Sequence, residues 1–187
     1  MLQITTMQKL IEKDLPNFPL DIIDQWIVYH AEDRVWPPAA TDGEMPNSDW
    51  ILLLKEKPLS YWKSIEWKEE KFKIEKNDFD LLDASMIVNI INAYTKGEFN
   101  NYSLDPGFYG FQERPRFDTI LDYLIENGEL PRKPIVLKQE NHLEVVDGFH
   151  RLAAYFTARD EQLVFSYSKK LPKVPINEWV GMWVGYS

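Results

Sequence analysis

The run Asp147-Gly148-Phe149-His150-Arg151 brings together residue types that bind phosphate. An apolar stretch typical of a strand precedes it and one typical of a helix follows, so we expect a strand-to-helix turn. Backbone N–H groups at a helix start attract anions, and Gly148 would let a ligand approach the main chain closely. Arg151 can grip phosphate oxygens with two N–H groups while His150 donates beside it. The segment therefore predicts a site for a phosphate-bearing nucleotide.

Asp147 would repel a bare phosphate, and two interpretations of it remain open. It could hold a magnesium ion or accept a proton from a substrate hydroxyl. Alternatively, its carboxylate could cap the following helix by accepting the N–H of His150, a common use of Asp before a helix. Arg151 could likewise pair with a surface carboxylate, but its place beside Gly148 and His150 favours a phosphate contact.

The elements that must position this turn are short. A polar turn joins two apolar segments into a predicted hairpin, and small and aromatic residues after the turn indicate a short helix. In chain order, the predictions are strands at 135–138 and 143–146, a helix at 152–156, a strand-like segment at 163–167, and a tail that contains Trp179 and Trp183.

The chain before the hairpin is predicted to be mainly helical. Apolar residues recur at helical spacing from Leu81 to Tyr94, and Gly97 is suited to end that helix. A second such stripe begins at Phe117 and stops at Asn127-Gly128. The other predictions are helices near 7–15 and from 20 to about 33, loops at 36–47 and 100–116, an edge strand at 65–74, and a strand or helical turn at 50–54.

The composition is that of an acidic globular protein. Its 187 residues are 44% hydrophobic and 27% charged, and the formal net charge of −9 argues against nucleic acid as a partner. The absence of cysteine excludes disulfides and thiolate chemistry. No apolar run is long enough to span a bilayer, and the N-terminus lacks the pattern of a secretory signal. We therefore expect a cytoplasmic protein without membrane contact.

At the turn from Asp147 to Arg151 and in the segments around it, the sequence resembles the ParB/sulfiredoxin-like superfamily. The similarity covers roughly residues 110–170, through Pro134-Ile135-Val136-Leu137, the hairpin, and Val146-Asp147-Gly148-Phe149-His150-Arg151-Leu152-Ala153-Ala154. Family members include chromosome-partition proteins that bind CTP, sulfiredoxin, which uses ATP, and a free-serine kinase with a similar Asp-Gly-x-His-Arg turn. The resemblance implies that ATP or another nucleotide is bound here by Gly148, Phe149, His150, Arg151, Arg116 and Thr119.

Departures from the family pattern narrow the implied function. Where sulfiredoxin carries its catalytic cysteine, this chain has Phe149, which excludes that reductase chemistry. The kinase branch needs an acidic base from the loop before the helix, and Glu113 is the nearest counterpart, although Glu113 and Arg116 would otherwise be taken for solvated charges. Partition proteins normally add a helix-turn-helix module after the core, whereas only about thirty residues follow Phe156 in this acidic chain.

The sequence thus predicts an α+β fold. A small mixed sheet with helices, of the ParB/sulfiredoxin-like kind, is expected at residues 99–187, after a mostly helical N-terminal extension at residues 1–98. The expected function is nucleotide binding, with phosphate transfer from a nucleoside triphosphate or diphosphate to a small hydroxylated substrate. Asp147 and Glu113 are the candidate catalytic residues, and Asp147 would be the ligand of a magnesium ion.

Two alternatives to this function remain open. One is a noncatalytic, nucleotide-switched module whose N-terminal helices bind a protein partner. The other is a ParB-like DNA-associated protein or nuclease, which would need a basic face that the average charge conceals.

Overall fold

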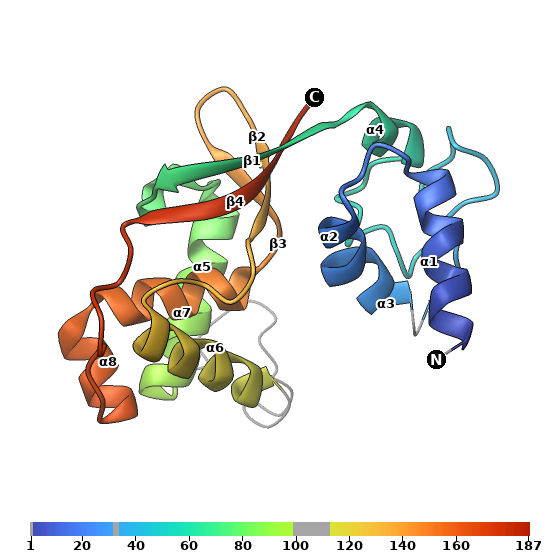
Figure 1. Cartoon of the computed structure of the whole chain (residues 1–187). Helices are drawn as coiled ribbons and strands as arrows, with labels where there is room; N and C mark the ends of the chain where they lie inside the picture. The colour runs from blue at the N-terminus through green and yellow to red at the C-terminus, as the bar shows by residue number, and fades with distance from the viewer. Residues whose placement is uncertain (1, 32–33, 99–112) are drawn as a thin grey trace.

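The computed structural model describes residues 2–31, 34–98 and 113–187, which form an α+β fold around a four-stranded mixed sheet (Figure 1). The strand order is β1-β4-β2-β3; β4 runs parallel to β2, and the two outer pairs are antiparallel. The strands are β1 (Glu66–Lys73), β2 (Ile135–Lys138), β3 (Leu143–Asp147) and β4 (Trp179–Tyr186).

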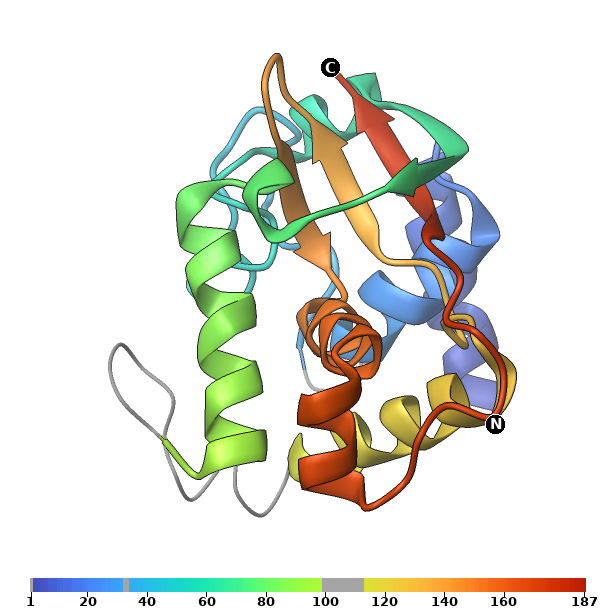
Figure 2. The same cartoon turned by 90° about the vertical axis from the view of Figure 1, so that its left-hand side faces the viewer.

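Helices cover both faces of this sheet (Figures 1 and 2). One face packs against the helices α5 (Leu81–Lys96), α6 (Arg114–Asn127), α7 (Phe149–Arg159) and α8 (Glu161–Ser168). The other face packs against the described part of residues 2–64, which we call the N-terminal layer. It contains α1 (Leu2–Asp14), α2 (Leu20–Ile22), the π-helix η1 (Ile23–Val28), α3 (Tyr29–Ala31) and α4 (Leu59–Ser64). A 3-10 helix, η2 (Lys76–Asp78), precedes α5.

Strand β2 shows how one sheet serves two cores. Successive side chains of a strand point to opposite faces, and Val136 enters the core beneath α5–α8, whereas Ile135 and Leu137 enter the core of the N-terminal layer. All three are fully or almost fully buried. A continuous apolar run is therefore required here instead of the alternation typical of a half-exposed strand.

Tryptophan dominates the core of the N-terminal layer. Trp26, Trp36, Trp50 and Trp62 are buried there, and the rings of Trp26 and Trp62 lie 5.1 Å apart, edge to face. Buried indole N–H groups need acceptors, and Trp62 donates to the Leu54 carbonyl at 3.2 Å. This aromatic packing stabilises a region whose regular elements are short.

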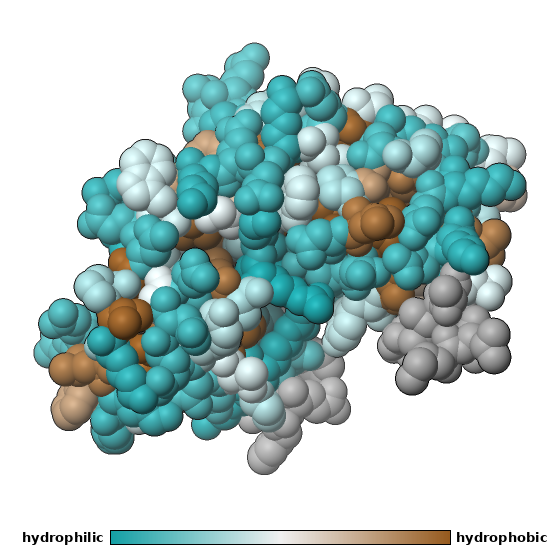
Figure 3. Space-filling model, in the orientation of Figure 1, coloured by the Kyte–Doolittle hydropathy of each residue, from teal (hydrophilic) through white to brown (hydrophobic). Residues whose placement is uncertain are grey.

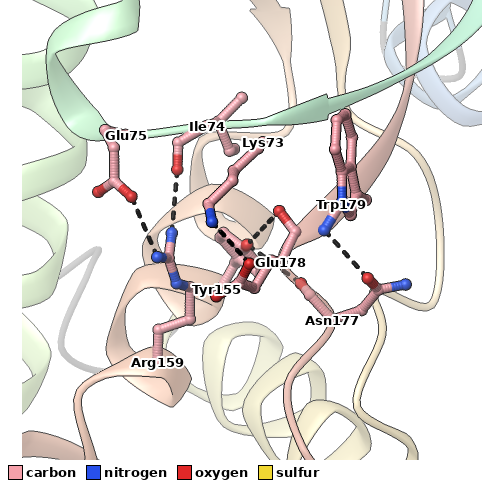
Figure 4. Close-up of polar contacts among 8 residues, drawn as sticks. All are labelled: Lys73, Ile74, Glu75, Tyr155, Arg159, Asn177, Glu178 and Trp179. Carbon is pink, nitrogen blue, oxygen red and sulfur yellow. Dashed lines mark hydrogen bonds and ion pairs between the residues drawn. The ribbon is translucent and has the colours of Figure 1, made fainter.

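Polar contacts fasten the start of β4 to α7 and β1 (Figure 4). The Tyr155 hydroxyl donates to the carbonyls of Asn177 and Glu178, at 3.1 and 3.3 Å. The guanidinium of Arg159 donates to the Ile74 carbonyl and to the Glu75 carboxylate, both at 3.0 Å. The first two bonds hold the residues before β4 against α7, and the other two hold the residues after β1 against the same helix.

Most of the predicted elements are confirmed. The hairpin, the edge strand and the long helices appear, and Gly97 and Gly128 end α5 and α6 in the left-handed conformation. The strand-like segment at 163–167 was wrong, because it is helix α8, capped by Asp160, whose carboxylate accepts the Leu163 N–H at 2.9 Å. The tail with Trp179 and Trp183 is strand β4.

The predicted division at residues 98 and 99 falls inside one packed unit. Strand β1 lies before that point and pairs with β4 along its whole length. Helix α5 also lies before it and shares the core of α6, α7 and α8. Helices α1 to α4 and η1 pack on the other face of the same sheet, and their core includes Ile135 and Leu137 of β2.

The face of the molecule in Figure 3 is mainly hydrophilic, with separate apolar patches. None of the helices that the structure describes is long and apolar enough to cross a membrane.

Candidate functional site

The turn between β3 and α7 has the conformation that the sequence predicted. Gly148 is the residue before the helix, at φ 113° and ψ 19°, in the left-handed region that favours glycine. Its carbonyl accepts the Leu152 N–H at 2.9 Å and so begins the helical bonding of α7. The residues of this turn, 147–151, all line a cavity of about 990 Å³.

Arg151 is not the surface guanidinium that the sequence suggested. Its exposed fraction is 6%, its Nη1 donates to Gln25 Oε1 at 2.6 Å, and its Nη2 forms an ion pair with Asp147 Oδ2. Burial lowers the pKa of Arg151, and the charge of Asp147 opposes that shift. Its terminal nitrogens are thus committed within the protein, and they contact a phosphate only if these bonds rearrange.

Asp147 accepts from Arg151 instead of capping α7. Gly148, which has no side chain, occupies the capping position, so the interpretation of Asp147 as a helix cap was wrong. Among the described residues, no group of three or more acidic or histidine side chains is arranged to hold a metal. Asp147 could offer its second carboxylate oxygen to a magnesium ion carried by phosphates, since such ions need only one or two protein carboxylates.

His150 is held in its neutral form by its surroundings. Burial lowers its pKa to about 4, and the nearby charges of Arg116 and Arg151 act in the same direction. Its Nε2 lies 3.2 Å from the Tyr94 hydroxyl and 3.7 Å from Glu113 Oε2. At neutral pH the ring can therefore act as a neutral donor or acceptor.

Glu113 and Arg116 lie close to His150, at the start of α6. Glu113 Oε2 lies 3.7 Å from Arg116 Nη1, is buried, and makes no hydrogen bond within the described chain. The guanidinium of Arg116 lies 5.5 Å from the centre of the Tyr29 ring, and both side chains line the cavity. Thr119 also lines the cavity, with its hydroxyl donating to the Pro115 carbonyl at 2.8 Å. Of the predicted loop at 100–116, residues 100–112 lie outside the described residues.

The cavity is lined by charged and by apolar side chains. Four basic side chains and two acidic ones line it, and one of those acids, Asp147, is already paired with Arg151. Its size is at the upper end of the range of roughly 300–1,000 Å³ typical of small-molecule sites. The charged lining residues are Lys55, Arg116, Arg132, Arg151, Asp24 and Asp147, and the apolar ones include Leu52, Leu53, Met86, Ile90 and Phe149.

Lys55 is positioned by a partly buried carboxylate network. Its Nζ lies 3.8 Å from Asp83 Oδ1 and 3.7 Å from Glu144 Oε1, and 5.9 Å from the centre of the Phe149 ring. Burial raises the pKa of Asp83, which the charge of Lys55 opposes. The second Asp83 oxygen accepts the Val145 N–H at 2.6 Å, so the network also fixes β3.

The structure thus brings together all of the predicted site residues that it describes, and it adds others from the N-terminal layer. Gln25, Tyr29 and Lys55 come from the segment predicted to be an extension, and Arg132 precedes β2. The sequence held one signal that Gln25 belongs to the site. Its apolar neighbours at 23, 26 and 27 indicate burial, and a buried polar side chain needs a partner.

Comparison of the chain with protein-family models, with curated proteins and with solved structures found no match.

Proposed function

We propose that this chain binds a nucleotide through its phosphates in the cavity beside Gly148. The observation that carries the proposal is the presence of four basic side chains around one cavity in a chain whose formal net charge is −9. Two of them, Lys55 and Arg151, also pair with carboxylates of the chain. Cations gathered in a concave, partly apolar site attract anions strongly, because the walls exclude screening water. The start of α7 adds backbone N–H groups at the same place.

The apolar wall suits the other part of such a ligand. Leu52, Met86 and Phe149 also line the cavity and offer surfaces for a base or sugar. We further propose a ParB/sulfiredoxin-like arrangement for the unit formed by α6, β2, β3 and α7. The chain order of helix, hairpin, glycine turn and helix supports it.

Thermal unfolding with ATP, ADP, CTP and GTP, each with and without magnesium, tests the binding proposal. A ligand that binds only the folded state stabilises it by about 2.7 kcal/mol at one hundred times its Kd. We expect a concentration-dependent rise in melting temperature with at least one nucleotide. No rise with any of them at millimolar concentration would contradict the proposal.

Arg116→Ala is the variant of choice for this test. Its side chain is 42% exposed, so its removal should change the free energy of unfolding by less than about 1 kcal/mol. It should weaken nucleotide binding by roughly tenfold, because a charged hydrogen bond to phosphate is lost. Lys9→Ala, an exposed residue of α1 outside the cavity, removes the same charge and should leave affinity unchanged.

A second proposed function, phosphate transfer to a small hydroxylated substrate, is favoured by the pair of Glu113 and neutral His150. Glu113 would take the proton of the acceptor hydroxyl as its oxygen bonds to the terminal phosphorus, and the shortened nucleotide would leave with the electron pair of the broken P–O bond. Glu113→Gln should then lower turnover and spare nucleotide affinity. Wild-type protein that binds a nucleotide but transfers phosphate to no small hydroxyl compound would favour the noncatalytic, partner-binding module.

A DNA-associated role remains a further alternative. In the described chain, the four basic side chains of the cavity are the only basic cluster that we connect with DNA binding. A gel shift with duplex DNA that weakens steeply with salt would support that role against the nucleotide proposal.

A further inference from the structure

Gln25 is an unusual residue for its position. It lies in the π-helix η1, flanked by buried Trp26 and Ile27, and only 6% of it is exposed. A π-helical turn is rare and is often found at functional sites. Gln25 also lines the cavity, so a polar group of the N-terminal layer reaches the turn at Gly148.

The bond with Arg151 fixes the orientation of the Gln25 amide. A guanidinium has N–H donors and no acceptor, so the amide atom 2.6 Å from Arg151 Nη1 must be the oxygen, Oε1. The other amide atom, Nε2, is then an NH2 donor, and it is buried without a hydrogen-bond partner among the described residues. Arg151 Nε is a second buried donor without a partner within that same part of the chain.

These two side chains therefore leave two unsatisfied donors beside one cavity. Both residues are more than nine-tenths buried, and both line the cavity together with Arg116 and Arg132. Buried polar groups in native proteins are normally paired. Because both donors are covered from solvent, a ligand in the cavity reaches them only if neighbouring side chains shift. A partner that satisfies two donors next to arginines must offer acceptor oxygens and negative charge.

We propose that Gln25 donates its amide N–H to a phosphate oxygen of the bound nucleotide, while its carbonyl oxygen holds Arg151 in place. This inference rests on the proposed nucleotide binding. It makes η1 part of the ligand site and makes the N-terminal layer a contributor to affinity. Arg151 Nε donates to the same phosphate group from the α7 side.

Gln25→Glu separates this role from a purely structural one. Glutamate keeps an oxygen to accept from Arg151 and adds an opposite charge beside it, so the contact that holds Arg151 survives. It also replaces the NH2 donor with a carboxylate oxygen, which repels phosphate. Gln162→Glu, at an exposed position of α8 outside this cavity, adds the same charge and serves as the matched control.

Isothermal titration of wild type, Gln25→Glu and Gln162→Glu measures the effect. The titrants are ATP, ADP, CTP, GTP and inorganic pyrophosphate. We expect Gln25→Glu to weaken nucleotide and pyrophosphate binding by at least about tenfold, with an unchanged or higher melting temperature, while Gln162→Glu binds like wild type. If Gln25→Glu does not fold, Gln25→Met keeps the volume but removes both the donor and the acceptor for Arg151, so we expect weaker binding together with a lower melting temperature.

The outcomes are distinguishable. Wild-type protein that binds none of the five compounds overturns the proposed function. Wild-type binding with equal affinity in folded Gln25→Glu or Gln25→Met overturns the role of Gln25 alone. Weaker nucleotide binding with unchanged pyrophosphate binding also overturns it, because the amide would then contact the base or sugar.

Discussion

The two faces of the sheet are stabilised by different kinds of packing. Beneath α5–α8 the core consists mainly of aliphatic residues on long, regular helices, and no Trp is found among its described residues. The N-terminal layer instead has four buried tryptophans, Trp26, Trp36, Trp50 and Trp62, joined by turns and by helical pieces of three to six residues apart from α1. Large rings bury much area from few positions, so irregular backbone can still form a core.

The difference explains where the cavity lies. Regular helices pack closely along their length, whereas short segments attached through single large rings leave a space beside the sheet that their own side chains do not fill. The cavity opens between these two regions and takes side chains from both. One face therefore supplies the turn at Gly148, and the other supplies Gln25, Tyr29 and Lys55.

Trp62→Ala should have the largest effect on this comparison. The Trp62 ring is fully buried and contacts the rings of Phe18 and Trp26, so its loss should cost about 3–5 kcal/mol in the free energy of unfolding. Urea denaturation measures this cost. Trp179→Ala is the control, because that ring is 56% exposed and should contribute far less. Equal costs would show that the N-terminal layer does not depend on its buried aromatic centre.

The same difference decides how much the sequence could predict. The spacing of apolar residues and a final glycine predict helices such as α5 and α6. Two apolar runs around a polar turn predict the hairpin. In the N-terminal layer the first helices were predicted in the same way, whereas residues 34–58 have no such period, because packing of rings such as Trp36 and Trp50 determines their path. Local patterns cannot report contacts of that kind.

At the site, the predicted strand-to-helix turn was confirmed, but the sequence did not predict the partners of Arg151. The spacing of Gly148, His150 and Arg151 identified the place, but the partners of Arg151 come from a residue 126 positions earlier and from Asp147. The prediction for segment 163–167 was wrong because a short, mainly apolar run of five residues does not distinguish a strand from a short helix. Strand β4 was missed because its glycines and exposed Trp179 obscure its alternation.

A pH titration of stability tests whether His150, which lines the cavity between the two regions, is buried in its neutral form. Its folded pKa of about 4 lies below the ordinary value of 6.5, so the unfolded state binds more protons between these two values. Stability is therefore lost as the pH falls from about 7 to 4, by up to roughly 3 kcal/mol from this group. The His150→Gln variant should lose less stability over that interval. Identical curves for the wild type and His150→Gln would contradict the burial of a neutral His150.

Gly148→Ala is expected to have an intermediate effect. A Cβ at Gly148 would stand 3.1 Å from Arg151 Nε and 3.1 Å from Pro134 Cβ, in a left-handed conformation that side chains disfavour. We expect a loss of about 1–3 kcal/mol in chemical denaturation even without ligand. Gly43→Ala, where a Cβ would meet nothing within 4 Å, should change stability by less than about 0.5 kcal/mol. Equal stability of the two variants would show that the turn relaxes around the added atom.

Asp21→Ala should have the smallest effect, although it breaks a hydrogen bond between the two regions. Trp183 of β4 donates its indole N–H to Asp21 Oδ2 at 2.7 Å, which links the sheet to α2. The bond is exposed, so water can replace the lost acceptor, and the cost should stay below about 1 kcal/mol.

That small cost is informative because it separates polar attachment from apolar packing. If packing of rings such as Trp26 and Trp62 holds the N-terminal layer, then Asp21→Ala should leave its near-ultraviolet circular dichroism unchanged, whereas Trp62→Ala should alter it. A loss of more than about 2 kcal/mol in Asp21→Ala would mean that this one bond sets the docking of the layer. The comparison between the two faces would then rest on polar contacts as much as on tryptophan.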